Sequence, residues 1–303
     1  AGATLRNRFN THPYVAGALL VALLALYPYA IRLPFQFSLN YNEGWNAAFS
    51  TLAFSGADLY RNTGEWVVNN YPPLSFHITG WLGHKLGDNI LAGRWIALAS
   101  LLGVAINIGL AVWRLSLRAD IAVYAGALFL ATFRAFFNAY VAMNDPQLLA
   151  HALMTAGLVL VAPGRISFRA LALATALMVL AGLVKHNLLA LPAAYWLFLA
   201  LTRDKRLVPF SLIGAALAGI GLIVIVAHYG PDFLDKLFSP RGYSLASIAN
   251  SLRPALFSLG GLLALWLLFS ATGLLPRRAL LVHLYVIVSL MIPSMPAVRS
   301  ASS

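Results

Sequence analysis

The sequence contains no cysteine and few charged residues. Without cysteine, the chain can form neither disulfide bonds nor thiolate metal sites. Asp, Glu, Lys and Arg together make up 10% of the 303 residues, whereas ordinary soluble domains contain about 25%. Hydrophobic residues make up 60%, which is more apolar surface than a soluble fold of this length can bury. The composition therefore predicts a polytopic, all-α membrane protein.

The short motifs of common soluble enzymes are missing as well. The chain has no P-loop, GxGxxG, GxSxG, HExxH or CxxC motif. Nothing in it therefore indicates ATP coupling, nucleotide-sugar binding by a Rossmann domain, or serine chemistry. The net charge of +12 would suggest nucleic acid in a soluble protein. Membrane topology explains that charge here, and we expect no nucleic-acid partner.

Apolar runs near 20 residues recur along the chain. At about 1.5 Å rise per residue, a helix of that length crosses a hydrocarbon core about 30 Å thick. We therefore expect a transmembrane helical bundle of about eight to ten spans. The nine spans that we place are 13–33, 89–113, 119–140, 146–162, 169–184, 188–202, 207–227, 254–274 and 279–295. The first run has no cleavage pattern before it and is predicted to be an uncleaved helix.

The charges divide between the two sides that these spans define. Of the 21 Lys and Arg, 11 lie on one side: Arg6, Arg8, Arg114, Arg118, Arg165, Arg169, Arg203, Lys205, Arg206, Arg277 and Arg278. Seven of the nine acids lie on the other: Glu43, Asp58, Glu65, Asp88, Asp145, Asp232 and Asp235. The positive-inside rule places the basic side and the N-terminus in the cytoplasm. We therefore expect the chemistry at the outer face.

The longest polar stretch is the outer loop 34–88. Its aromatic residues alternate with Asn and Gly, and "EGWNAAFSTLAFSG" has helical spacing. Trp and Tyr are comfortable at the level of the lipid headgroups. The loop is therefore predicted to form interfacial helices.

Glu43 and Asp145 are two acids that could serve either to cap a helix or to take part in chemistry. Glu43 follows Asn42, which fits a helix N-cap, and an acid in a first helical turn is favourable without any further role. Pro146 fits the first position of a helix, so Asp145 has the same structural interpretation. Two carboxylates brought to one membrane face by different spans are, however, what acid–base or cation-assisted group transfer requires. Both interpretations remain open.

Four basic or histidine side chains accompany these acids. Lys185 and His186 end the fifth span, where a lysine can snorkel to the headgroups or offer a point charge to a phosphate. Arg134 is a weaker phosphate candidate, with a structural pairing to Asp145 as the alternative. His151 is either a hydrogen-bonded packing residue or part of a site, because ionisable residues at membrane depth are functional candidates.

Four stretches together resemble the GT-C superfamily of integral-membrane glycosyltransferases. These stretches are "YNEGWNA" (41–47), "GADLYRNTGEWVVNNYPPL" (56–74), "MNDPQLLAHAL" (143–153) and "LVKHNLLALP" (183–192). The superfamily includes protein O-mannosyltransferases and the aminoarabinose transferase of lipid A. The resemblance predicts a catalytic transmembrane module at residues 1–230, including the outer loop 34–88. Residues 231–303 are then a C-terminal transmembrane region that is either truncated or unusually short.

The resemblance implies an inverting transfer of a sugar from a polyprenyl-phosphate donor. The acceptor would be a hydroxyl of a glycan, lipid or protein at the outer face of the plasma (bacterial inner) membrane. Glu43 matches the general base, and Asp145 matches a second acid that binds a divalent cation, Mg²⁺ or Mn²⁺, in some members. Lys185 matches the residue that contacts the donor phosphate, with His186 and Arg134 as candidates beside it. Tyr71, Pro72 and Pro73 match a helix start that lines the site, and Asn42, Trp45 and His151 are expected to line it too.

The chain departs from the family pattern at one position, and two other functions are alternatives to this prediction. Asn42 stands where many relatives have another acid, so the usual pair of adjacent carboxylates is incomplete. A transporter or lipid flippase is the first alternative, although it would place ionisable groups near the bilayer midplane between inverted repeats. The second is a catalytically inactive membrane subunit of an envelope-glycan assembly.

Overall fold

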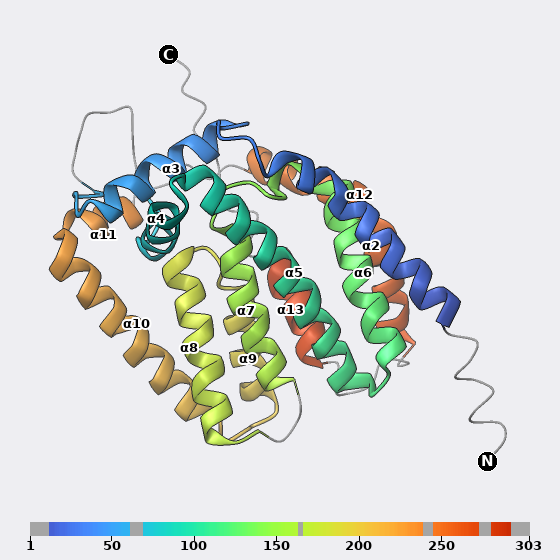
Figure 1. Cartoon of the computed structure of the whole chain (residues 1–303). Coiled ribbons are helices and arrows are strands. Elements are labelled where there is room, and N and C mark those ends of the chain that lie inside the picture. Colours follow the sequence, from blue (N-terminus) through green and yellow to red (C-terminus); the bar gives the residue numbers. More distant parts are fainter. Residues whose placement is uncertain (1–11, 61–68, 163–165, 239–244, 273–279, 292–303) are drawn as a thin grey trace.

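The computed structural model describes residues 12–60, 69–162, 166–238, 245–272 and 280–291 (Figure 1). Within these ranges the chain is entirely helical, with twelve α-helices, one 3-10 helix and no strand. The all-α prediction is therefore confirmed. The helices are α2 (His12–Arg32), α3 (Tyr41–Phe54), α4 (Leu74–Leu86), α5 (Asn89–Ser116), α6 (Ala119–Phe136), η1 (Asn138–Tyr140), α7 (Gln147–Val161), α8 (Phe168–Val184), α9 (Ala190–Leu201), α10 (Leu207–Tyr229), α11 (Asp232–Leu237), α12 (Leu245–Ala271) and α13 (Leu280–Met291).

Four of the described helices are long and apolar enough to cross a membrane. These four are Pro13–Arg32, Asn89–Ser116, Ala119–Phe136 and Leu207–Tyr229. By their length and composition they indicate a multi-pass membrane protein. The predicted spans 146–162, 169–184 and 188–202 form shorter apolar helices of 15, 17 and 12 residues, below the roughly 20 of a typical span.

Several predicted span limits are wrong. The helix of the expected span 254–274, α12, already begins at Leu245. The expected span 119–140 ends at Phe136, after which the chain turns into the short helix η1. The helix α9 begins at Ala190, two residues after the start of the expected span 188–202, because a turn follows the end of α8 at Val184. By contrast, the segment 34–88 contains two helices, α3 and α4, as its aromatic spacing predicts.

The long helix α5 lies in the middle of the bundle, between α6 and α7 (Figure 1). From there the packing continues outward from α6 to α2 and from α7 through α8 to α10. Small residues allow the close approach of neighbouring backbones. A Cβ atom on Gly126 of α6 would lie 2.9 Å from the carbonyl oxygen of Ala105 in α5, and one on Gly157 of α7 would lie 3.1 Å from that of Ala174 in α8.

The helices α3, α4 and α11 gather at one end of the bundle (Figure 1). This is also the end at which α5 and α7 begin and α8 and α10 finish. α3 and α4 cross closely, because a Cβ atom on Gly80 of α4 would lie 2.3 Å from the carbonyl oxygen of Ser50 in α3. We call this end of the molecule the polar end.

Aromatic residues join the crossed pair α3/α4 to α10 and α11. Phe49 and Phe76 have ring centroids 5.5 Å apart, and Tyr60 packs edge-on against both Tyr229 and Phe233. Next to this cluster, His77 Nε2 and the Tyr229 hydroxyl lie 2.6 Å apart and share a hydrogen bond between α4 and α10.

We expect Gly80→Ala to lower the free energy of unfolding by about 1–3 kcal/mol, because the added methyl group meets backbone rather than a movable side chain. Gly182→Ala in α8 is the matched control, since a Cβ atom there has nothing within 4 Å. The control should be neutral or stabilising by up to about 1 kcal/mol. Thermal unfolding in detergent measures both changes, and equal midpoints for the two variants would contradict the close α3–α4 crossing.

We also expect stability to fall as the pH is lowered past the ordinary histidine pKa of 6.5. Burial, and after it the charge of His228, lowers the pKa of His77 in the folded protein. The unfolded chain then takes up the proton first, so the stabilising effect of neutral His77 is present above 6.5 and is lost as the pH falls toward the lowered value.

Thermal midpoints measured between about pH 7.5 and pH 5 test this expectation. His77→Gln should remove part of the pH dependence. His84→Gln, on the exposed side of the same helix, is the control for the loss of one histidine. An identical pH profile for wild type and His77→Gln would show that His77 titrates alike in both states.

Candidate functional site

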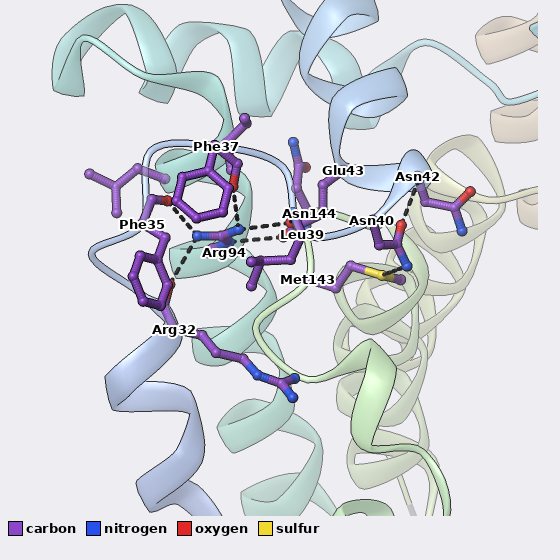
Figure 2. Close-up of polar contacts among 12 residues, drawn as sticks. Arg32, Phe35, Phe37, Leu39, Asn40, Asn42, Glu43, Arg94, Met143 and Asn144 are labelled. Carbon is purple, nitrogen blue, oxygen red and sulfur yellow. Dashed lines mark hydrogen bonds and ion pairs between the residues drawn. The ribbon is translucent and has the colours of Figure 1, made fainter.

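At the polar end, Glu43 of α3 and Arg94 of α5 form a buried ion pair (Figure 2). Arg94 has no exposed surface and Glu43 is 1% exposed. The pair is bidentate, since Arg94 Nε donates to Glu43 Oε1 and Nη2 donates to Oε2, both at 2.8 Å. This geometry fixes the direction as well as the distance between the two helices.

Every polar hydrogen of Arg94 is used in this arrangement. Its remaining donors reach the carbonyl oxygens of Arg32 at 2.9 Å, of Phe37 at 3.0 Å, and of Phe35. Five hydrogen bonds therefore match the five donors of a guanidinium group. The turn between α2 and α3 wraps around the side chain of Arg94, as Figure 2 shows.

Both oxygens of Glu43 are saturated as well. Besides Arg94, Oε2 accepts from the backbone N–H of Leu39 at 2.8 Å and Oε1 accepts from that of Asn144 at 3.2 Å. Burial raises the pKa of Glu43, but the hydrogen bonds and the charge of Arg94 outweigh burial and hold it below its usual value. A general base needs a free lone pair within reach of the proton. The geometry gives Glu43 a role in holding the backbone instead.

A second buried ion pair joins Asp145 to Lys185, with Asp145 Oδ1 3.1 Å from Lys185 Nζ. Oδ1 also accepts from the backbone N–H of Gln147 at 2.7 Å and so supports the start of α7. Among the described residues, no hydrogen bond reaches the other carboxylate oxygen, Oδ2. Lys185 Nζ lies 4.7 Å from the centre of the Tyr71 ring, a cation–π distance.

Asn144 connects the two ion pairs. Its N–H donates to Glu43, its carbonyl oxygen accepts from Asn46 Nδ2 at 2.8 Å, and its side chain donates to the carbonyl oxygen of Asn89 at 3.2 Å. Gly93 makes the room for it, because a Cβ atom there would lie 2.0 Å from the Asn144 side chain. The structure therefore brings Glu43, Asp145 and Lys185 into one contiguous network.

A small cavity lies beside Asp145. Its polar lining comes from Asn46, Ser50, Ser75, Thr79, Asn144 and Asp145. Its volume is about 10 Å³, which is room for about one water molecule. Two buried atoms, Asn46 Oδ1 and Ser75 Oγ, have no hydrogen-bond partner among the described residues. Buried polar atoms of this kind require a partner, so the cavity is suited to one hydroxyl-sized group.

Of the residues between 34 and 88 that are predicted to line the site, Tyr71 lies beside Lys185. The Trp45 ring packs edge-on against that of Tyr71, with centroids 5.3 Å apart. Pro72 and Pro73 are buried immediately before α4, which begins at Leu74. The predicted helix start after the two prolines is therefore confirmed.

The other predicted residues differ in their relation to the network. His151 lies one turn into α7, with Nε2 2.8 Å from Gln147 Nε2, and His186 is half-buried next to Lys185. Arg134 lies half-buried on α6, and among the described residues no hydrogen bond or ion pair reaches it. Its suggested pairing with Asp145 is wrong, because Lys185 takes that place.

The N-cap of α3 is Asn40 rather than Asn42. Asn40 has an extended backbone, and its side-chain oxygen accepts from the N–H of Asn42 at 2.6 Å. Asn42 is thus the second residue of the helix, and its carbonyl oxygen accepts from Asn46. Asn42 supplies backbone to the network, and its side chain has no hydrogen bond among the described residues.

The residues around Asp145 do not match a divalent cation. Mg²⁺ prefers carboxylates in an octahedral arrangement of oxygens, and Lys185 already balances the single carboxylate here. Within the described ranges, no group of three or more His, Asp or Glu side chains gathers anywhere. We therefore assign no step to Mg²⁺ or Mn²⁺.

Arg94 is the residue that sequence reasoning missed. It lies in the second turn of a helix that was read as an apolar span, 51 residues from its partner. An ionisable residue inside an apolar span is a signal in itself, because it requires a partner. Asn46 and Ser75 gave no comparable signal, since their importance comes from the cavity that they share.

We expect Glu43→Gln to lower the free energy of unfolding by about 3–5 kcal/mol, because it leaves Arg94 charged and buried without its counter-ion. Asp120→Asn, which breaks the exposed pair with Arg118, is the matched control and should change stability little. Thermal unfolding in detergent compares the two. A Glu43→Gln variant with wild-type stability would contradict the structural role of this carboxylate.

A comparison of this chain with protein-family models, with curated proteins and with solved structures gives no match. What the chain shows by itself is an all-helical, multi-pass membrane protein with a buried polar network at one end of its bundle.

Proposed function

We propose that the protein is a membrane glycosyltransferase that moves a sugar from a polyprenyl-phosphate donor to an acceptor hydroxyl, with Asp145 as the reactive carboxylate. The observation that carries this proposal is that one carboxylate oxygen of Asp145 is not hydrogen-bonded. Oδ1 is held by Lys185, whereas Oδ2 has no hydrogen-bond partner among the described residues and Asp145 lines a hydroxyl-sized cavity. Glu43, the base that the family resemblance suggests, has no such free oxygen.

The groups around the cavity are suited to an acceptor hydroxyl. Asp145 Oδ2 can accept its proton, and the unpartnered Ser75 Oγ and Asn46 Oδ1 can orient the oxygen. A positioned base contributes about 10²–10⁴ to the rate of such a step. Access for a whole sugar requires α3 and α4 to move apart at this end, because the cavity admits only one small group.

Lys185 is suited to the leaving phosphate. Its ammonium group has three donors, of which Asp145 takes one, and the face of Tyr71 stabilises the charge. In the proposed step, Asp145 takes the proton as the hydroxyl oxygen bonds to the anomeric carbon. The bond from that carbon to the phosphate breaks, and the electron pair leaves with the polyprenyl phosphate beside Lys185. The sugar configuration is inverted, and no covalent enzyme intermediate forms.

The proposed topology follows from the same division of charge. We propose that the nine apolar segments cross the plasma (bacterial inner) membrane, with the N-terminus in the cytoplasm and the polar end at the outer face. The basic connectors Arg114/Arg118 and Arg203/Lys205/Arg206 belong to the opposite end of the bundle, as the positive-inside rule requires. The location of the network at one end favours an enzyme over a transporter, whose ionisable groups are expected near the midplane.

A catalytically inactive structural subunit is the second candidate, and a specific observation favours it. Both buried carboxylates, Glu43 and Asp145, are neutralised by buried bases, Arg94 and Lys185. Such pairs hold helices together without any chemistry. The two candidates differ in whether the open oxygen of Asp145 is used.

We expect Asp145→Asn to reduce transfer at least about 100-fold, because an amide cannot take the proton. The assay uses purified protein in proteoliposomes with a panel of polyprenyl-phosphate sugars and hydroxyl acceptors, and it measures the release of free polyprenyl phosphate. Asp88→Asn, the same change at the N-cap of α5, is the matched control, because asparagine caps a helix as well as aspartate does.

A double variant separates chemistry from folding. Asp145→Asn with Lys185→Gln removes both buried charges at once, so it avoids the cost of one unpaired charge. If the double variant folds and transfers sugar like wild type, Asp145 is not the base. Absence of transfer by wild type with every donor of the panel would favour the inactive subunit, and substrate flux without transfer would favour a transporter.

A further inference from the structure

A second cavity lies far from the polar network, in a groove between α2, α5 and α6. It measures about 440 Å³, within the range of about 300–1,000 Å³ that small-molecule sites span. All of its lining residues are apolar, including Leu19 of α2, Ile106 and Trp113 of α5, and Val123 of α6. No charged or polar side chain among the described residues lines it, so its occupant must be apolar along its whole length.

The groove is open to the membrane at its sides. Leu19, Ile106 and Trp113 on its rim are 50%, 61% and 46% exposed. Its floor is formed where α5 and α6 approach closely, since a Cβ atom on Gly109 would lie 3.0 Å from the carbonyl oxygen of Ala122. Small residues therefore form the floor of the groove, and the neighbouring large side chains form its rim.

The length of the groove matches one leaflet of a bilayer. Its lining runs from Leu102 to Trp113 on α5 and from Ala119 to Leu130 on α6. Each stretch is about 16 Å long at about 1.5 Å per residue. Half of a hydrocarbon core about 30 Å thick is about 15 Å. A single acyl chain that reaches from the membrane surface to the midplane has this length.

Basic residues lie at the end of the groove that meets the membrane surface. Arg114 and Arg118 flank the turn between α5 and α6, next to the lining residues Trp113 and Ala119. Arg114 Nη1 donates to the carbonyl oxygen of Val159 in α7 at 2.7 Å and keeps its other donors. Arg118 is paired with Asp120, but its side chain is 59% exposed. Two arginines against one aspartate leave this turn with a charge of +1. The groove therefore ends at a positively charged surface.

We propose that this groove binds one acyl chain of an anionic phospholipid, with the phosphate of its headgroup at Arg114 and Arg118. The lipid belongs to the leaflet that surrounds the turn between α5 and α6, which is the cytoplasmic leaflet in the proposed topology. The apolar lining and the leaflet-long dimension select the chain, and the arginines select the charge of the headgroup. The site is separate from the carboxylate chemistry and does not depend on it.

Quenching of Trp113 fluorescence by brominated phospholipids tests the proposal. Wild type and Trp113→Phe are placed in phosphatidylcholine vesicles that contain increasing fractions of brominated phosphatidylglycerol or, separately, brominated phosphatidylcholine. The difference between the two proteins isolates Trp113, which lines the groove. We expect this component to saturate at an about fivefold lower fraction of phosphatidylglycerol than of phosphatidylcholine, since one basic residue near the surface gives about that preference.

Two variants distinguish the groove from ordinary lipid contact. Val123→Phe should fill the groove and abolish the saturating component, whereas Leu128→Phe, on an exposed position of the same helix outside the groove, should retain it. Arg118→Gln should remove the preference for the anionic lipid, because the turn then carries no net charge, while leaving chain binding intact.

Two results would overturn the proposal. Non-saturating quenching that is equal for both lipids would mean that the groove holds exchanging bulk lipid only. Dissociation of an oligomer by Val123→Phe, together with a Trp113 that no lipid quenches, would mean that a second copy of the chain covers the groove. Sugar transfer is not measured, so a failure here leaves the proposed function untouched.

Discussion

The ion pair between Glu43 and Arg94 is the interaction on which the polar end of the molecule depends. Removing two charges from water costs several kcal/mol for each ion, and only complete hydrogen bonding offsets such a cost. Here all five guanidinium donors and both carboxylate oxygens are used. Arg94 of α5 bonds the end of α2 and the turn before α3, and Glu43 of α3 bonds that turn and the segment before α7. The two side chains together thus hold these parts of the chain in register.

The second ion pair depends on the first through Asn144. The N–H of Asn144 is held by Glu43, and Asp145 is the next residue along the chain. The two carboxylates nevertheless have different capacities. Both oxygens of Glu43 accept hydrogen bonds, whereas one oxygen of Asp145 accepts none from the described residues. Asp145 also lines a cavity with two more unpartnered polar atoms. A rigid, fully satisfied pair that supports a partly satisfied one is an arrangement suited to placing a reactive group accurately.

The two cavities lie at different positions along the bundle. The polar one lies at the end where α3 and α4 cross, and the apolar one lies along α5 and α6 toward the opposite end. A glycine of α5 with a close neighbour lines each cavity: Gly93 faces the Asn144 side chain in the polar one, and Gly109 faces the backbone of Ala122 in the apolar one. What differs is the lining. Polar side chains that lack partners favour a hydroxyl-sized group, whereas an apolar groove that opens to the bilayer favours a lipid chain.

The sequence by itself determined the helical, membrane-spanning character of the chain, the helices in the outer loop and the helix start after Pro72 and Pro73. These features depend on local apolar runs, aromatic spacing and proline geometry. It also singled out Glu43, Asp145 and Lys185, because charges are rare in so apolar a chain. Only the tertiary structure decided the partners. Glu43 pairs with Arg94 across 51 residues, and Asp145 pairs with Lys185 instead of Arg134. Such choices depend on how helices cross, which no local pattern encodes, and they move the reactive role from Glu43 to Asp145 in the function that we propose.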